Sequence, residues 1–534
     1  MDFLTDNLRN LSLKNGSNMP VALMINSTQF EKSFLEKIQL PYDNDDFGTF
    51  RVLYDLPDEV KKDLKIEASK NYSSFIIINF KWIHDYSVDP KHQNCAKKLN
   101  EERQDLTDSD FNVIQESMRV SVLDLLTKLK DQKLQFGIDV HKALADLLEK
   151  TNLGHAFLEN AVLANYHYKV DERNKFSTIC FPEGKFKVAA PEIFGESQNI
   201  CRFLTDAPAN IITPIGFIDY IKKYIAELGL ENAIELIIRD KNWMKENNFN
   251  LLLAVASGSI DCQPPYFLEM HINKKSADSK PKLALVGKGI TFDTGAYTLK
   301  DWQGMAEMRS DMGGAAICAL AIIAQTRLQQ IQNSNNSGNP LPHFCALLPL
   351  TENMVSGASH KPFDVVTSHS GKTVCLADLD AEGRLVMSDA LAYSDKTLQA
   401  EYIMNIATLT GSVEAALGRS HTGVWGTSLD FYKLLEKAGN QSLERFQLMP
   451  LLKMHKDAMS DIDYADTINW IDQKPGATLA AAFCSHFVEN KNWLHLDVGG
   501  SMEAKGKECP FISEDMFSGR PVRAIIQLLQ NFCE

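Results

Sequence analysis

From about residue 191 to the C-terminus, continuous apolar runs alternate with helical patterns, and this alternation limits the possible folds more than any other feature. The predicted helices span 314–329 and 383–394. The apolar runs, interpreted as buried strands, are NLLLAVASG (250–258), KLALVGKG (282–289), HFCALLPL (343–350), AEYIMNIATL (400–409) and WLHLDVGG (493–500). Apolar strands separated by helices are typical of a parallel or mixed sheet with helices on both faces. The sequence therefore predicts an α/β fold with a central mixed sheet.

The length of 534 residues exceeds one average domain. The first third holds short apolar runs at 20–25 and 73–80 and a helical pattern over 113–165, which suggests a small α/β domain. Residues 83–110 are polar and lack apolar periodicity, as expected of a surface excursion. We predict a smaller N-terminal α/β domain over 1–175, a connecting segment over 176–204 and a larger catalytic domain over 205–534.

Charge and cysteine content exclude several classes of protein. The chain has 55 Lys and Arg against 69 Asp and Glu, a net charge of −14, which argues against a dedicated nucleic-acid binder. Its ten cysteines are scattered without a C-x-x-C pair, as in reduced intracellular proteins. No apolar leader and no run of about 18 apolar residues occurs. We expect a cytoplasmic protein that does not bind membranes.

Charged side chains cluster just after the apolar runs, where ligands collect in α/β sheets. They are Lys288, Asp293, Lys300, Asp311, Asp380 and Glu382. Each motif alone is more often a turn, a cap or a solvated acid pair. Together, four carboxylates suit two divalent cations, which acidify a bound water for hydrolysis. Asp380 and Glu382, if extended, would point the same way towards one such cluster.

A lysine beside metal ions has two possible roles. It can bind a metal as a neutral amine, or remain an ammonium that polarises a carbonyl oxygen. Lys288 and Lys300 could divide these roles, and the residues alone leave the assignment open.

Three motifs, in this order and at these separations, resemble the leucyl aminopeptidase family (cytosol aminopeptidases, the M17 metallopeptidases). They are KGITFDTGAYTLK (288–300), MRSDMGGAA (308–316) and DAEGRL (380–385). The resemblance extends over about 195–534 through FLTDAPANIITP (203–214), ENMVSG (352–357), ATLTGS (407–412), ATLAAAF (477–483) and WLHLDVGG.

The resemblance implies a metal-dependent aminopeptidase that acts on short peptides and prefers leucine-like N-terminal residues. It implies one metal on Lys288, Asp293, Asp311 and Glu382, and a second on Asp293, Asp380 and Glu382. It further implies that Lys300 stabilises the reacting carbonyl oxygen and that Arg384 holds a bicarbonate ion. Zinc is expected at the tighter site, with Mn²⁺, Mg²⁺ or Co²⁺ possible at the exchangeable one.

The resemblance also implies substrate contacts and an assembly. Met308 matches a position that lines the pocket for the first side chain, and Thr408, Leu409 and Gly411 match a loop that contacts the substrate backbone. The implied assembly is a homohexamer with its active sites facing an interior cavity.

Departures from the family pattern occur near the site. Asp378 and Leu379 stand before Asp380 where the family has N-T-D, and the extra carboxylate of Asp378 is expected to alter the side-chain preference. Ala296 and Phe363 replace glycines; if these positions need positive φ, each costs about 1 kcal/mol.

The sequence is open to three other interpretations. SHSGKT (368–373) resembles a P-loop, but the required glycine is replaced by Val366, and a hairpin turn explains the segment better. A two-metal phosphatase or nuclease also uses clustered carboxylates, but the lysine ligand and the run of motifs favour a peptidase. The remaining alternative is a catalytically divergent paralogue with a structural or binding role.

Overall fold

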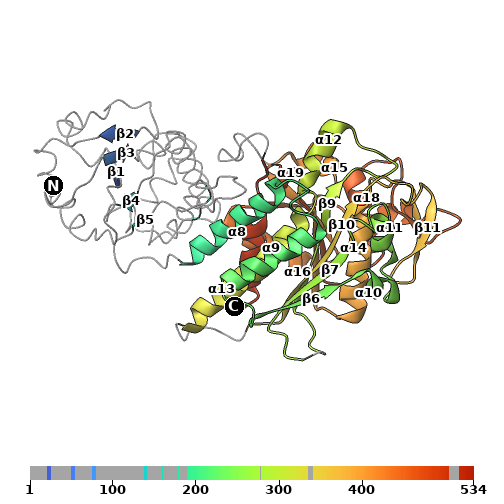
Figure 1. The fold of residues 1–534 in the computed structure, drawn as a ribbon, viewed down its shortest axis with the longest axis horizontal. Helices are drawn as coiled ribbons and strands as arrows, with labels where there is room; N and C mark the ends of the chain where they lie inside the picture. The colour runs from blue at the N-terminus through green and yellow to red at the C-terminus, as the bar shows by residue number, and fades with distance from the viewer. Residues whose placement is uncertain are drawn as a thin grey trace, which may run out of the picture. The chain divides into compact units, whose positions relative to one another are not determined.

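The structure is a computed structural model of the chain, drawn in Figure 1. It describes residues 21–25, 50–53, 75–79, 137–140, 159, 163, 179–180, 189–276, 278–334, 341–503 and 516–533. Two compact units divide between Gly195 and Glu196. The predicted excursion at 83–110 lies outside the described residues, and the domain boundaries at 175 and 204 stay predictions.

The first unit contains a five-stranded sheet in the order β2-β3-β1-β4-β5. Its strands are β1 (Val21–Ile25), β2 (Phe50–Leu53), β3 (Phe75–Asn79), β4 (Gly137–Val140) and β5 (Ile179–Cys180). β2 runs antiparallel to β3, and the remaining neighbours are parallel. The apolar runs at 20–25 and 73–80 thus form adjacent parallel strands, a setting that favours continuous apolar sequence.

The second unit is built on a nine-stranded mixed sheet in the order β15-β14-β17-β13-β8-β10-β7-β6, with β9 also paired to β10. The strands are β6 (Ile234–Arg239), β7 (Tyr266–Ile272), β8 (Leu283–Gly287), β9 (Gly289–Asp293), β10 (Phe344–Asn353), β13 (Tyr402–Ala407), β14 (His421–Gly426), β15 (Arg445–Leu448) and β17 (Trp493–Asp497). The central strands β10, β8, β13 and β17 are parallel, while β7 and β14 are antiparallel to their inner neighbours. The α/β fold with a mixed sheet is therefore confirmed.

Helices cover both faces of this sheet (Figure 1). The long helix α13 (Gly313–Ser334) packs against β8, β10 and β13 on one face, together with α9 (Pro214–Glu227) and α20 (Val522–Asn531). On the other face, α14 (Gly383–Ala392) and α18 (Gly476–Ser485) share one apolar core with Ala284 and Val286 of β8. Alternate residues of one strand thus serve opposite helix layers. Other helices are α8 (Ala189–Asp206), α10 (Lys241–Glu246), α12 (Trp302–Glu307), η3 (Met308–Ser310), η4 (Tyr393–Thr397), α15 (Gly411–Leu417), α16 (Leu429–Ser442), α17 (Lys453–Ala458) and α19 (Gly499–Met502).

The run NLLLAVASG, predicted as a strand, is instead helix α11 (Asn250–Ala256), and that prediction is wrong. A short apolar run does not distinguish a buried strand from a buried helix, since both bury every side chain. The backbone amides of Leu251 and Leu252, in the first turn, donate to Asp389 Oδ2 at 2.8 and 3.2 Å. A distant carboxylate thus satisfies two of the amides that a helix start leaves unpaired.

The predicted hairpin around SHSGKT is confirmed. β11 (Asp364–Thr367) pairs antiparallel with β12 (Thr373–Leu376), and β16 (Thr467–Ile468) runs parallel to β12 in the same three-stranded sheet. β12 leads into the segment that carries Asp380 and Glu382. Among the described residues, no helix has the length and apolar character needed to cross a membrane.

Candidate metal centre

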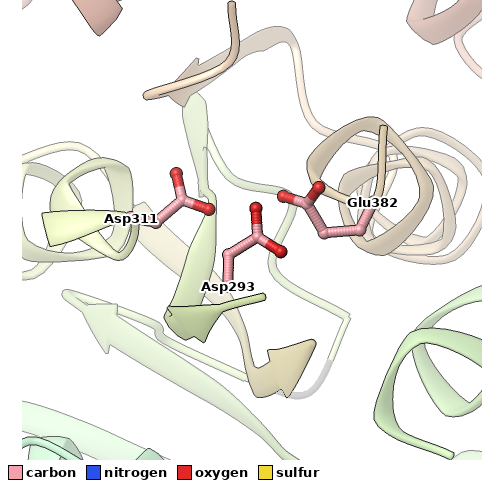
Figure 2. Close-up of side chains that lie close together, drawn as sticks. All are labelled: Asp293, Asp311 and Glu382. Atoms are coloured by element: carbon pink, nitrogen blue, oxygen red, sulfur yellow. The ribbon is translucent and has the colours of Figure 1, made fainter. Parts of the chain in front are cut away.

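Three buried carboxylates from three separate segments meet at one point of the second unit. Asp293 is the last residue of β9, Asp311 lies between η3 and α13, and Glu382 directly precedes α14. One oxygen of each carboxylate lies within 4.8 Å of the others. Figure 2 shows the three side chains pointing into a common space. The predicted acids after the strands do come together in the tertiary structure.

Two lysines join these carboxylates. Lys288 Nζ lies 2.8 Å from both Asp311 Oδ2 and Glu382 Oε1, and it donates to the carbonyl of Thr408 at 3.0 Å. Lys300 Nζ lies 2.9 Å from Asp293 Oδ2 and also contacts Asp380. All five residues predicted as metal ligands therefore belong, together with Lys300, to one network of charges.

The expectation that Asp380 and Glu382 point the same way from an extended segment is wrong. The chain turns at Leu379 and Asp380, and Glu382 has helical dihedral angles, with φ −77° and ψ −35°. Asp380 consequently contacts Lys300, whereas Glu382 contacts Lys288. Because α14 begins directly after Glu382, the period-2 alternation of an extended strand does not apply to these two acids.

Burial and mutual repulsion shift the pKa values of the four acids. Burial raises the pKa of Asp293 to about 6, with a further contribution from Glu382, and raises the pKa of Asp380 to about 7. Burial also raises the pKa of Asp311 well above its usual value. In Glu382 the effect of burial is outweighed by Lys288 and Lys300, which leave its pKa below the usual value. Four acids and only two lysines give the site an excess of acidic groups, so an added cation would stabilise it.

The donor set fits divalent cations. Asp311 Oδ2, Asp380 Oδ1 and Glu382 Oε1 are buried, and among the described residues each is paired only with a lysine ammonium. Two ammonium groups leave part of the charge of four carboxylates uncompensated, and uncompensated buried charge is costly unless a further cation offsets it. Oxygen ligands of this kind suit Mg²⁺, Mn²⁺ and Zn²⁺.

Comparison with known proteins decides the family. Residues 199–526 match the model of the cytosol aminopeptidase family, catalytic domain. The chain belongs to this family. It is 36% identical to the cytosol aminopeptidase of Xenopus tropicalis over 386 residues, 71% of each protein, and 37% identical to that of Homo sapiens over 385 residues, again 71% of each. Membership of this family supports the assignment of the protein to the aminopeptidases, which are hydrolases of peptide bonds.

Two further comparisons show how much of each chain is matched and which solved structure shares the fold. The cytosol aminopeptidase of Dictyostelium discoideum is 37% identical over 356 residues, 66% of this chain and 64% of that protein. A solved structure described as the bottromycin maturation enzyme BotP in complex with Mn has a TM-score of 0.74 and covers 97% of this chain and 100% of its own. At 22% identity this likeness shows the fold alone.

Two residues that sequence reasoning missed orient the acids. Asn353, at the end of β10, donates to Asp293 Oδ1 at 2.8 Å and to the carbonyl of Leu379 at 2.9 Å. Thr298 Oγ1 accepts from the amide of Asp380 at 2.8 Å. Asn353 lies in the motif ENMVSG, but nothing in that motif indicated which side chain it would meet.

The remaining predicted residues lie around this network. Thr408 Oγ1 donates to Asp311 Oδ1 at 2.8 Å, and the amide of Leu409 donates to Asp497 Oδ1 at 3.2 Å. Gly411 begins α15, and Met308 begins η3, which ends beside Asp311. Their contacts with a substrate stay predictions.

The last two predicted residues, Arg384 and Asp378, form hydrogen bonds near the acid pair. Arg384 Nη1 donates to the carbonyl of Asn469 at 2.8 Å, and burial lowers the pKa of Arg384. Asp378 Oδ1 accepts from the amide of Asp380 at 2.8 Å.

Both residues that replace family glycines adopt positive φ. Ala296 has φ 47° and Phe363 has φ 72°. Side chains rarely adopt this region, because Cβ approaches the following carbonyl. Positive φ was the condition for the predicted backbone strain, and both positions meet it.

Proposed function

We propose that this protein is a two-metal aminopeptidase that removes N-terminal amino acids from short peptides, with a leucine-like preference altered by Asp378. The convergence of Asp293, Asp311 and Glu382 within 4.8 Å, between two lysines, is the observation that carries the proposal. The family of the chain supports the same reaction class.

Five side chains would hold the ions: Lys288, Asp293, Asp311, Asp380 and Glu382. Zinc is proposed at the tighter site, with Mn²⁺, Mg²⁺ or Co²⁺ at the exchangeable one, since an oxygen-rich set discriminates weakly between these metals. Bound divalent ions supply a water of lowered pKa and polarise a carbonyl group. Binding as an amine requires Lys288 to lose its proton to the solvent.

The chain's own residues orient the peptide and balance charge. Lys300 keeps 17% of its side chain exposed while contacting Asp293, so its ammonium is placed to stabilise negative charge on the reacting carbonyl oxygen. Asp311 is proposed to lie near the free α-amino group, which restricts cleavage to the N-terminal residue. Arg384 is proposed to hold bicarbonate as a proton carrier; its buried Nε donates to no partner among the described residues.

We further propose a cytoplasmic homohexamer with active sites that face an interior cavity. The name cytosol aminopeptidase, carried by the relatives, supports the location. An enclosed cavity would admit short peptides and exclude folded proteins.

A panel of fluorogenic aminoacyl-amidomethylcoumarins with Leu, Met, Ala, Arg and Lys tests the proposal. The protein is preincubated with Mn²⁺ or Zn²⁺, or with a chelator, and Glu382→Ala serves as the metal-deficient control. We expect metal-dependent release from wild type and none from Glu382→Ala, which should also bind less metal. Absence of release from every substrate by protein with two bound metals would overturn the aminopeptidase and favour the divergent paralogue.

A further inference from the structure

The segment 377–381 carries the acid pair but belongs to no strand or helix. It leaves β12 after Leu376 and ends just before α14 begins at Gly383. Backbone amides and carbonyls that are buried without a partner cost free energy, so an irregular buried segment needs partners from elsewhere. Its conformation depends on which groups provide them.

One side chain, that of Asn469, provides more of these partners than any other described residue. Its Oδ1 accepts from the amides of Ala377 at 2.8 Å and Asp378 at 3.3 Å. Its Nδ2 donates to the carbonyls of Asp378 at 2.5 Å and Ala381 at 3.3 Å. Asn469 therefore makes four hydrogen bonds with the backbone on both sides of Asp380.

Asn469 is itself held firmly. It follows β16, which pairs in parallel with β12, and its amide donates to the carbonyl of Cys375 at 3.1 Å. The residue has 0% exposure, so water does not compete for its carboxamide. Its carbonyl accepts from Arg384 Nη1 at 2.8 Å. The same residue thus contacts the segment before the acids and the guanidinium after them.

We infer that Asn469 is a positioning residue that holds Asp380, Glu382 and Arg384 in one arrangement through the backbone of 377–381. The inference rests on the proposed two-metal function, because it assigns Asn469 to the geometry of that site. A carboxamide suits this position because it offers an acceptor and two donors on one short side chain. Aspartate would lack the donors, and leucine of similar size would lack both kinds of group.

Asn405 offers a matched control. It is also fully buried, and its carboxamide is also fully engaged: Nδ2 lies 2.7 Å from His495 Nδ1, and Oδ1 accepts from Trp493 Nε1 at 2.9 Å. Its Nδ2 also donates to Met387 Sδ of α14 at 3.5 Å, and none of these three partners lies in 377–381. Asn405→Leu therefore removes a buried carboxamide from the same unit without removing any bond to 377–381.

The test compares wild type, Asn469→Leu and Asn405→Leu in three measurements on the full chain. They are Mn²⁺ affinity by calorimetric titration of metal-free protein, kcat and KM for Leu-amidomethylcoumarin at saturating Mn²⁺, and Tm. We expect Asn469→Leu to weaken Mn²⁺ binding by about 10 to 100-fold, as loss of a group that orients metal ligands does. We expect kcat to fall more than KM changes, because the acids and Arg384 are misplaced while the substrate pocket remains.

Asn405→Leu should lower Tm comparably and leave Mn²⁺ affinity and kcat within about twofold of wild type. If Asn469→Leu fails to accumulate as folded protein, Asn469→Ser, which offers one hydroxyl in place of the carboxamide, takes its place in the same comparison. Mn²⁺ affinity and kcat equal to wild type, or equal losses in both variants, would overturn the inference. A wild-type protein that neither binds Mn²⁺ nor cleaves the panel would overturn the proposed function itself, which separates the two failures.

Discussion

Gly383 provides the space that the Lys288 side chain occupies. A Cβ atom at position 383 would lie 2.4 Å from Lys288 Cε and 2.7 Å from its Nζ. Real Cβ atoms do not approach other atoms this closely, so any larger residue must displace the lysine. The glycine in the D-A-E-G-R motif is thereby explained by packing against a predicted metal ligand.

Gly383→Ala should therefore weaken metal binding without unfolding the protein. Displacement of Lys288 from Asp311 and Glu382 is expected to lower Mn²⁺ affinity by at least about tenfold and to lower kcat/KM with it. Calorimetric titration and peptidase assays measure both effects. Gly357→Ala is the control, since a Cβ there meets nothing within 4 Å; equal behaviour of the two variants would contradict the packing argument.

Metal binding at pH 7 should release protons. Burial alone would lower the pKa of Lys288, but Asp311 and Glu382 outweigh it and raise that pKa, so the metal-free site holds an ammonium. An amine ligand must lose this proton. Asp380, with a pKa of about 7, is partly protonated at pH 7 and releases a further fraction of a proton when a metal binds. Calorimetry in buffers of different ionisation enthalpy counts the protons, and Lys288→Met should release about one fewer. Binding without proton release would exclude Lys288 as a ligand.

Stability should fall between pH 6.5 and 4 because of His343. Burial, with a contribution from His271, lowers its pKa from 6.5 to about 4. The unfolded chain then binds a proton in this window that the folded chain does not, so the free energy of unfolding decreases as the pH falls from 6.5 towards 4. His343→Gln should flatten this part of the curve in urea unfolding. Parallel curves for the two proteins would show that His343 does not contribute.

Phe363→Gly should stabilise the protein by about 1 kcal/mol, because Phe363 has φ 72° and glycine adopts this region without strain. The side chain is 60% exposed, so little packing is lost with it. Phe363→Ala keeps Cβ and therefore the backbone strain, so it should not increase the free energy of unfolding. Equal free energies of unfolding for the Gly and Ala variants would show that the backbone is unstrained there.

Asp378→Asn should move side-chain preference from basic residues towards leucine. The bond from the Asp380 amide to Oδ1 of residue 378 is retained by asparagine, so the fold is expected to be unaffected. A half-exposed ion pair between Asp378 and a basic substrate side chain would be worth up to about 1 kcal/mol. Its loss predicts a severalfold change in the ratio of kcat/KM for Arg and Leu substrates. Identical ratios would show that this carboxylate does not face the substrate side chain.

Local sequence determined which residues carry the charge and most of the elements that hold them. The apolar runs of β8, β10, β13 and β17 and the helices α13 and α14 were predictable, because burial on both faces demands continuous apolar sequence and helices have their own period. The strand-end rule then placed Lys288, Asp293 and Asp311 near one edge of the sheet.

Only the tertiary structure decided what those local signals leave open. The run at 250–258 contains α11, whose first amides pair with Asp389, 138 residues away from Leu251. Asp380 and Glu382 contact different lysines because the chain turns at Leu379 and Asp380, and Asn469, 91 residues from Asp378 in sequence, bonds to the backbone of that turn. Periodicity reports only which side chains are buried, whereas the partners of buried polar groups are set by chain segments that meet after folding.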